Sequence, residues 1–386
     1  MFLLRLLFKN AFRHKLRTLL TLVGLIVAIS SFGLLRTVVD AWYAGAEASS
    51  SSRLITRSAT SLTVPLPLAY AQRLRAVDGV TGVSWSNWFG GIYISERNFF
   101  PQFAVDGPSY LPLYPEFKVS DDERLAWLKD RTGVLVGRNL AQKFGWKVGD
   151  NVPLRGTIYP GTWNFTIRGI YEGADPSVDQ NQMLMHWSFV NDTLRARAGG
   201  RSSNLVGVFV LGIRDPNNAA VISSRVDDQF RNSLAETLTE TEKAFQLGFV
   251  SMSEAVLVAL QAVSYIVIVI IMAVMANTMT MTARERLAEY ATLKALGFAP
   301  SFVVRLLFGE SLMIALVGGL LGILLTLPMA SAFGGATGSL FPVFRVSGTT
   351  MALQALAALV VGLVSAAWPS WKMSRIPIVA GLRHVA

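Results

Sequence analysis

The feature that most constrains the fold of this 386-residue chain is the presence of four long apolar runs. A helix needs about 20 predominantly apolar residues to cross the hydrocarbon core of a bilayer. Each run is long enough, so we expect membrane spans at Thr18–Val39, Ala255–Thr282, Ser301–Pro328 and Thr350–Trp371. A signal peptide cleaved near Ser30 is the alternative interpretation of the first run, but its apolar stretch continues to Val39 and favours a retained anchor.

The distribution of charge agrees with membrane residence and indicates an orientation. The net charge is +10, yet the segment from Asp40 to Lys243 contains 21 basic and 21 acidic residues. The basic excess therefore lies beside the apolar runs, which is the positive-inside pattern and not a nucleic-acid footprint. With four spans, the three basic flanking segments share one side, so we expect both termini in the cytoplasm. Residues 1–17, which alternate apolar and basic side chains, are predicted to form an amphipathic helix on the inner leaflet.

The long segment between the first two spans has the composition of a folded domain. Its pattern mixes strands and helices and predicts an α+β domain. The Ser120 to Glu123 capping box begins a predicted helix that ends at Lys129. A second helix is expected at Arg138–Phe144, stopped by a glycine, while residues 61–64 are expected to form a strand. Residues 235–249 are expected to run as a helical stalk into the second span.

The stretch between the second and third spans is too charged to lie inside a bilayer. Glu285, Arg286, Glu289 and Tyr290 lie one turn apart on a predicted short helix, with apolar residues along it. Gly297 follows where a helix C-terminus favours a residue with positive φ. Pro300 can then open the next helix, because the first turn needs no N–H from it.

These residues resemble the FtsX/MacB family of ABC transporter permeases. The family signature reads roughly E-R-x-x-E, then a hydrophobic residue, two variable residues and [LM]-[KR]-A-[LI]-G, followed by a helix with a glutamate and a glycine-rich tail. The corresponding residues here are Glu285, Arg286, Glu289, Leu293, Lys294, Ala295, Leu296 and Gly297, then Glu310, Gly318, Gly319 and Gly322. Tyr290 stands where the family usually has a small aliphatic residue, and we expect it to change how a partner's groove is filled.

A second match lies in the large polar segment. Residues 135–150 and 165–171 are similar to the periplasmic core domain of MacB-type permeases. The resemblance implies an α-helical membrane protein with four transmembrane helices and a large α+β extracytoplasmic domain inserted between the first two. The predicted organisation is a cytoplasmic interfacial helix at 1–17, spans at 18–39, 255–282, 301–328 and 350–371, a core domain with its stalk at 40–254, a coupling helix at 283–300, an outer loop at 329–349 and a cytoplasmic tail at 372–386.

The sequence contains no recognisable catalytic constellation. The phosphate-binding motif G-x-x-x-x-G-K-[ST] does not occur, so ATP and Mg²⁺ would be held by another polypeptide, and no cofactor is expected on this chain. There is no cysteine, and His186 is the sole histidine of the large segment, so neither a metal site nor a histidine-based triad is predicted. We expect His186 and the tryptophans of this segment to pack in a core.

Two features of the third span invite interpretation. Glu310 is an acid within an apolar run, where charge is costly and often functional. We expect it to pair with Arg305 or Lys294 near the cytoplasmic face, with a proton or substrate role as the alternative. The small-residue spacing of Gly318, Gly319 and Gly322 allows close helix contact, although ordinary glycine frequency in membranes would also explain it.

The resemblance also implies partners and a mechanism. A permease subunit of this type would work with a cytoplasmic ABC ATPase and a second permease copy, identical or related, in lipid of the bacterial inner membrane. Closure of the ATPases would move the coupling helix, and the spans would transmit the motion to the outer domain, a mechanism called mechanotransmission. A periplasmic adaptor and an outer-membrane duct are further partners that this type allows. The alternative is a regulator of a cell-wall hydrolase, as FtsX itself is. A membrane-anchored enzyme is disfavoured.

Overall fold

The computed structural model describes residues 13–175, 177–197, 203–337, 341 and 343–377. The residue contacts divide the chain into two compact units. One, here called the helical unit, comprises Met1–Asp40, Glu254–Ala336 and Phe344–Ala386; the other, here called the inserted domain, comprises Ala41–Ser253 and Thr337–Val343. Most of the predicted amphipathic helix at 1–17 and part of the tail at 372–386 lie outside the described residues.

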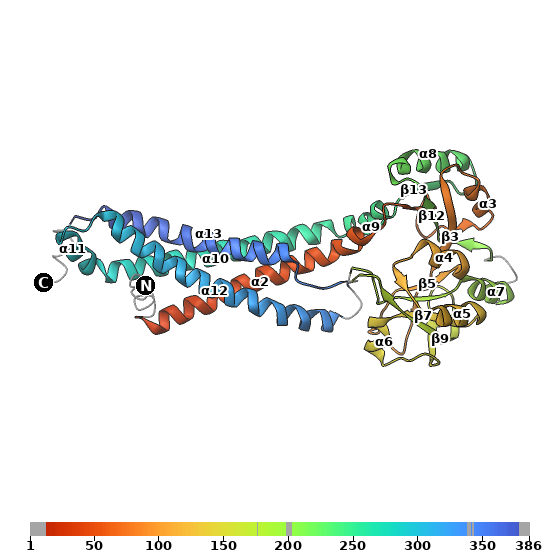
Figure 1. The fold of residues 1–386 in the computed structure, drawn as a ribbon, viewed down its shortest axis with the longest axis horizontal. Helices are drawn as coiled ribbons and strands as arrows, with labels where there is room; N and C mark the ends of the chain where they lie inside the picture. Colours follow the sequence, from red (N-terminus) through yellow and green to blue (C-terminus); the bar gives the residue numbers. More distant parts are fainter. Residues whose placement is uncertain (1–12, 176, 198–202, 338–340, 342, 378–386) are drawn as a thin grey trace. The chain divides into compact units, whose positions relative to one another are not determined.

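The helical unit contains four helices that are long and apolar enough to cross a membrane within the described part of the chain, as predicted. A short helix, α11, lies between the second and third of them (Figure 1). The helices are α2 (Lys15–Ala48), α10 (Glu254–Glu285), α11 (Leu287–Ala295), α12 (Pro300–Thr337) and α13 (Gly348–Ser374). Each predicted span lies inside one of the long helices, which extend beyond it at both ends.

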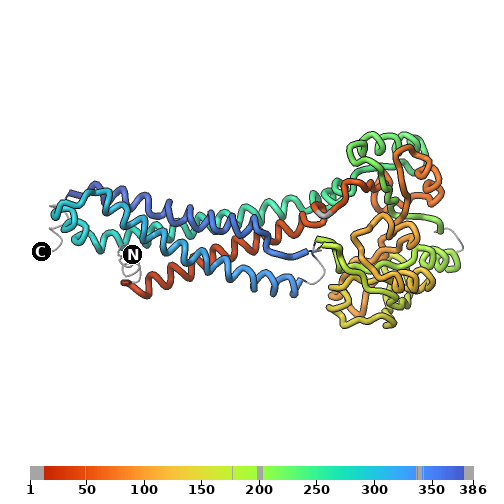
Figure 2. The backbone as a smooth tube through the Cα atoms, viewed as in Figure 1, coloured from red at the N-terminus to blue at the C-terminus, as the bar shows by residue number. Residues whose placement is uncertain are grey.

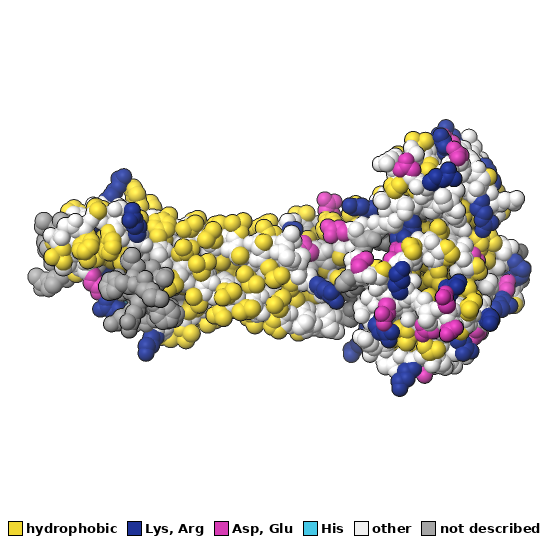
Figure 3. Space-filling model, viewed as in Figure 1, with side chains coloured by type: hydrophobic (Ala, Val, Ile, Leu, Met, Phe, Trp, Pro, Cys, Tyr) yellow, Lys and Arg dark blue, Asp and Glu magenta, His cyan; other side chains and the backbone are white. Residues whose placement is uncertain are grey.

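The long helices pack around a shared apolar core and leave apolar side chains outside. Leu25, Ile29, Met275, Ala315 and Val361 meet in this core, one or more from each long helix. The surface of the helical unit in Figure 3 is largely hydrophobic, with Lys and Arg side chains at the end where α11 lies. An apolar exterior of this kind is suited to lipid, because a lipid-facing helix has no need to hide its apolar residues.

The described part of the inserted domain is built on a mixed sheet of eleven strands, in the order β13-β1-β12-β3-β5-β10-β7-β9-β8-β4, with β6 paired to β9. A separate two-stranded sheet joins β2 and β11. The strands are β1 (Arg53–Ser58), β2 (Leu66–Pro67), β3 (Val80–Trp88), β4 (Gly91–Ile92), β5 (Gln102–Val105), β6 (Phe117–Lys118), β7 (Gly133–Gly137), β8 (Asn151–Gly156), β9 (Gly161–Gly173), β10 (Met183–His186), β11 (Leu205–Val206), β12 (Val208–Ile213) and β13 (Thr237–Thr241).

Helices cover both faces of the main sheet. One face packs against α4 (Gly107–Leu113) and α5 (Asp121–Lys129), which contribute Tyr110 and Trp127 to one core. The other face packs against four further helices, α3, α6, α7 and α8. Their bounds, with those of the remaining helices, are α3 (Tyr70–Arg75), α6 (Arg138–Phe144), α7 (Trp187–Arg197), η1 (Pro216–Asn218), α8 (Ala219–Phe230) and α9 (Glu242–Ser251).

Coverage on both faces explains why the central strands are continuous apolar runs. In β7, Val134 and Val136 enter one core while Leu135 enters the other. In β10, Met183 and Met185 enter the first core and Leu184 enters the second. Successive strand residues point to opposite faces, so a strand buried on both sides needs apolar residues at every position.

Local signals predicted several elements correctly. The Ser120 hydroxyl accepts the N–H of Glu123 at 3.3 Å and donates to its carboxylate, and α5 ends at Lys129, as expected. Helix α6 occupies Arg138–Phe144 and stops at Gly145, which has φ +69°. Such a left-handed residue is cheap for glycine and costly for most others.

Two predictions in the inserted domain were wrong. Residues 61–64 form a turn and not a strand, because the Ser61 hydroxyl accepts the N–H of Thr63 and offers the backbone a local alternative. The expected stalk helix at 235–249 begins only at Glu242, and the preceding residues form β13, which pairs with β1. Alternating threonines favour the strand, and Thr241 caps the helix by accepting the N–H of Ala244.

Candidate functional site

Helix α11 and the residues on either side of it form the candidate site. Helix α10 ends at Glu285, and Arg286 interrupts the helix before α11 begins. The prediction that Glu285 belongs to the short helix was therefore wrong. At the other end, Gly297 has φ +91° and its N–H donates to the carbonyl of Lys294, while the N–H of Phe298 donates to the carbonyl of Leu293. This double closure is the Schellman motif, which confirms the predicted stop.

A buried ion pair joins the start of α11 to α12. The Arg286 Nη1 donates to Glu310 Oε2 at 3.0 Å, and these residues are 8% and 2% exposed. The Arg286 Nε donates to Glu289 Oε2 at 2.9 Å, so one guanidinium serves two carboxylates. Burial lowers the pKa of Arg286, but Tyr290 and the two carboxylates raise it overall above its ordinary value. The arginine therefore stays charged in this position.

The predicted partners of Glu310 were wrong. Arg305 is five residues before Glu310, which places it about 140° around the helix, and its side chain is exposed. The Lys294 Nζ instead donates to the carbonyls of Met373, Ser374 and Ile376 at 3.0, 3.0 and 3.1 Å. Lysine thus closes the C-terminus of α13, where helix carbonyls lack partners. Burial lowers the pKa of Lys294 from its ordinary value.

Tyr290 lies inside the helical unit and does not face outward, contrary to the expectation that it would alter a partner's groove. Its side chain is buried among Ala283, Val303, Leu307 and Met373. Burial raises its pKa above the ordinary value, so the ring is neutral. An aromatic ring in place of a small aliphatic residue fills the space between α10, α11, α12 and α13, which makes α11 hard to displace without moving its neighbours.

Arg17 in the first turn of α2 and Arg13 just before this helix complete the site, and sequence analysis did not identify either as a partner of the glutamates. Arg17 forms a two-pronged ion pair with Glu285, with Nη1 to Oε2 and Nη2 to Oε1 distances of 2.8 and 2.5 Å. Arg13 donates to the carboxylate of Glu289. Burial raises the pKa of Glu289, but the hydrogen bonds from Arg13 and Arg286 outweigh it and hold the pKa below its ordinary value. The site therefore contacts all four long helices.

The C-terminal end of α11 is exposed to solvent, in contrast to its buried start. Residues 295–301 are all exposed, and the apolar side chains of Leu296 and Phe298 are 72% and 45% exposed. They lie on a tight turn whose backbone is fixed by Gly297. The predicted residues of this region thus divide by exposure. Buried or half-buried are Arg286, Tyr290, Leu293 and Lys294, and exposed are Glu285, Glu289, Ala295, Leu296 and Gly297. The two exposed glutamates still bond to arginines of the helical unit, whereas Leu296 faces solvent.

The glycines of α12 lie where helices approach closely. A Cβ added to Gly318 would lie 2.6 Å from Leu25, and one added to Gly322 would lie 2.8 Å from Ile29. A Cβ added to Gly319 would lie 2.4 Å from the Cβ of Ala358. Any side chain at these positions would force α12 away from α2 or α13.

Metal and histidine chemistry find no support in the described residues. No group of three or more His, Cys, Asp or Glu side chains there could hold a metal ion. His186 is buried, stacks on Trp127 and shares a hydrogen bond between its Nε2 and the carbonyl of Trp127. The expectation of a packed histidine is confirmed.

Comparison with known families decides the identity. The family described as MacB-like periplasmic core domain matches residues 18–236, which is more than half of the chain. The family described as FtsX-like permease C-terminal matches residues 262–378, including α11. The chain belongs to the FtsX/MacB family of ABC transporter permeases.

Several proteins are similar to this permease. It is 22% identical over 391 residues to the uncharacterized ABC transporter permease MJ1507 of Methanocaldococcus jannaschii, covering 95% of this chain and 88% of that protein. It is 29% identical over 193 residues to the uncharacterized ABC transporter permease protein Rv0987 of Mycobacterium tuberculosis, covering 50% of this chain but only 21% of that longer protein. The extracellular domain of the noncanonic ABC-type transporter YknZ from Gram-positive bacteria aligns with 49% of this chain and 100% of its own, with 13% identity and a TM-score of 0.34.

Proposed function

We propose that this permease transmits force from a separate cytoplasmic ABC ATPase to the inserted domain, which then acts on a substrate outside the membrane. The observation that carries the proposal is the two-sided character of the α11 region. Its inward side is tied to every long helix by charged and packed contacts, and its outward side presents Leu296 and Phe298 to solvent. A helix that transmits force needs firm contacts with the spans on one side and an exposed surface for a partner protein on the other.

The contacts of α11 would pass a displacement on to the spans. A push on the helix moves α12 through the Arg286–Glu310 pair and α13 through Lys294. Helix α2 follows through the ion pairs of Arg13 and Arg17. Helices α2 and α10 are single helices of 34 and 32 residues, and a continuous helix is a stiff route for coupling.

The proposed assembly contains two permease copies, identical or related, and two ATPase subunits. The ATPases would supply nucleotide binding, since this chain has no P-loop motif. Both termini and α11 would lie in the cytoplasm. Ion pairs between the start of α2 and the α10–α11 junction, and the bonds of Lys294 to the end of α13, support placing these three segments on one side of the membrane (Figure 2).

The experiment uses the Leu296→Asp variant, with Leu234→Asp as control because Leu234 is a fully exposed leucine of the inserted domain. A charge on the outward turn should lower ATPase binding by on the order of tenfold or more, as at an interface hot spot, and abolish stimulation of ATP hydrolysis. The control should bind and stimulate like the wild type. Normal binding and stimulation by Leu296→Asp would refute the proposal, as would ATP hydrolysis by the purified permease alone.

A further inference from the structure

The chain enters and leaves the main sheet of the inserted domain on two neighbouring strands. Strand β1 follows α2, and β13 leads directly into α9 and then α10. The two strands are antiparallel, with Leu54 opposite Thr241. The next residues outward, Arg53 and Glu242, therefore meet at the point where both connections reach the sheet.

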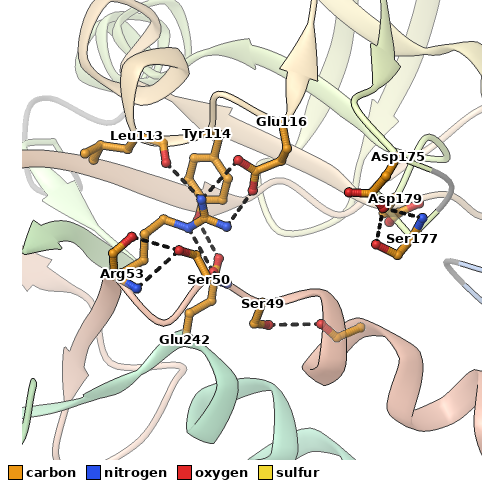
Figure 4. A network of polar contacts seen from close by, with 12 residues as sticks. Ser49, Ser50, Arg53, Leu113, Tyr114, Glu116, Asp175, Ser177, Asp179 and Glu242 are labelled. Atoms are coloured by element: carbon orange, nitrogen blue, oxygen red, sulfur yellow. Dashed lines mark hydrogen bonds and ion pairs between the residues drawn. The ribbon is translucent and has the colours of Figure 1, made fainter. Parts of the chain in front are cut away.

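Arg53 makes three sets of contacts at this point (Figure 4). Its Nε donates to Glu242 Oε2 at 2.8 Å. Its Nη1 donates to Glu116 Oε2 at 3.1 Å and to the carbonyl of Leu113 at 2.9 Å, and its Nη2 donates to Glu116 Oε1 at 2.5 Å. The guanidinium also lies over the ring of Tyr114, 4.1 Å from its centroid. A planar fork with five donors is the one side chain that can hold three segments at once.

Glu242 completes the cluster from the side of the outgoing helix. Its carboxylate accepts the hydroxyl of Tyr114 at 3.0 Å and the backbone N–H of Ser50 at 3.0 Å, besides Arg53. Ser50 lies two residues after the end of α2, so the start of α9 is bonded to the connection between α2 and β1. Burial raises the pKa of Tyr114 well above its ordinary value, so this phenol stays protonated and can donate.

The third segment leads into β6 and so to the long strand β9. Glu116 directly precedes β6, whose Phe117 is paired with Gly173 of the long strand β9. Phe117 also stacks on Tyr114, with ring centroids 5.4 Å apart. A displacement of Arg53 or Glu242 is therefore felt by Glu116 and then by β9, which pairs with β7 and β8.

Burial of the charges in this cluster costs free energy, which offsets much of the stability that its ion pairs contribute. Arg53 and Glu242 are 5% and 6% exposed, and two carboxylates share one cation. Removing charges from water costs several kcal/mol for each ion, and apolar residues of similar volume often stabilise a protein as well or better. Buried ionic groups of this kind are better explained by the fixed geometry that they impose.

We propose that Arg53 is a positioning residue that transfers the motion of the outgoing helices to the interior of the inserted domain. This inference rests on the proposed function. By holding the chain's incoming strand, its outgoing helix and the segment before β6 in one rigid joint, Arg53 makes residues 113–118 follow α9. Without it, the Tyr114–Glu242 hydrogen bond would be the remaining side-chain link between α9 and residues 113–118 among the contacts described here, and much of the motion of α9 would be absorbed locally.

The test measures amide hydrogen exchange in the complex of full-length permease and ATPase, with and without ATP. The variant is Arg53→Met, which keeps an unbranched stem but lacks the guanidinium group and so bridges no carboxylates. Arg53→Lys is a second variant that keeps the charge but cannot reach all three partners. The control is Arg138→Met, because Arg138 forms an exposed ion pair with Glu172 in the same domain.

In wild type and control, ATP should change exchange both in α9 and at 113–118. In the Arg53 variants the change in α9 should persist while the change at 113–118 is strongly reduced, because the Tyr114–Glu242 hydrogen bond alone remains between the two segments. An unaltered ATP response at 113–118 in a folded Arg53 variant would overturn the inference and leave the proposed function standing. If ATP changed neither segment in the wild type, both the proposed function and the inference would fail.

Discussion

The helical unit and the inserted domain each bury an arginine that is shared by two glutamates. In the helical unit, Arg286 serves Glu289 and Glu310, and in the inserted domain, Arg53 serves Glu116 and Glu242. The difference lies in access. Glu289 is 43% exposed at its side chain, whereas both partners of Arg53 are largely buried.

Because of this difference, the ion pair of Arg286 with Glu289 is accessible to another protein, whereas those of Arg53 are not. Arg286 has a buried partner that fixes its position and a solvent-exposed partner that is also held by Arg13. A docked protein can reach Glu289 and redistribute these bonds. Arg53 has no comparable opening, so its cluster is suited to passing on a movement and not to receiving one.

Removing the buried carboxylate of the helical unit should have the largest effect. Glu310→Ala removes the buried partner of Arg286 and leaves only the exposed Glu289 to pair with its charge, so it should cost about 3 kcal/mol of unfolding free energy, the lower end of the range for breaking a buried pair. The double variant Arg286→Met, Glu310→Met should recover most of this loss while remaining uncoupled from the ATPase. Denaturation of the purified permease in mixed micelles gives these values, and equal losses in single and double variants would contradict the account.

In the inserted domain, Glu242 and Glu116 should contribute unequally to the free energy of unfolding. Glu242→Gln disturbs contacts with Arg53, Tyr114 and Ser50 and should cost about 1.5–3 kcal/mol, as expected for hydrogen bonds to charged groups. Glu116 is more exposed, and Glu116→Gln should cost less. Urea unfolding followed by tryptophan fluorescence can rank them, and a larger loss for Glu116→Gln would show that the cluster is organised differently.

Substitution by alanine should disturb helix packing at Gly319 of α12 but not at Gly335 of the same helix. Gly319→Ala places a methyl group 2.4 Å from the Cβ of Ala358 and should cost about 1–3 kcal/mol through overpacking. Gly335→Ala is the matched control in the same helix, because the described residues leave open space there. The control should be neutral or stabilising, and thermal melts of the detergent-solubilised protein compare the two. Similar melting temperatures would show that α12 can move away freely.

The smallest effect concerns pH and distinguishes the two units. Burial lowers the pKa of His186 from its ordinary value of 6.5. The unfolded chain therefore binds a proton just below pH 6.5 while the folded domain does not, so stability should fall as the pH drops from 6.5 towards the folded pKa. His186→Gln should flatten this slope, whereas Gly335→Ala, a substitution in the helical unit that changes no titratable group, should not. Urea midpoints at pH 7.5 and 5.5 measure the slope, and an unchanged slope in His186→Gln would contradict the assignment.

Features encoded by neighbouring residues were predictable from the sequence. The four spans, the Ser120 cap and the glycine stops at Gly145 and Gly297 all follow from local composition and backbone geometry. Strand β13 was missed because its threonines favour a strand only when β1 is beside it. Local pattern could place α11 but could not tell which of its side chains point inward.

The partners of charged residues could not be predicted for the same reason. Arg286 and Glu310 are separated by 24 residues, and Arg53 and Glu242 by 189. Proximity in sequence suggested Arg305 for Glu310, although the helix turns that residue away. Arg53 gave no signal at all, since an arginine at the start of a strand is ordinarily solvated.

The most direct test of the central claim is a distance between the inserted domains of two permease copies in the complete complex. The chain has no cysteine, so a spin label on Lys147→Cys, an exposed position, is unique. Pulsed electron spin resonance should show that trapping the ATPase with a non-hydrolysable ATP analogue shifts the distance, and that adding Leu296→Asp abolishes the shift. A distance that ignores the nucleotide, or a shift that survives Leu296→Asp, would contradict the account.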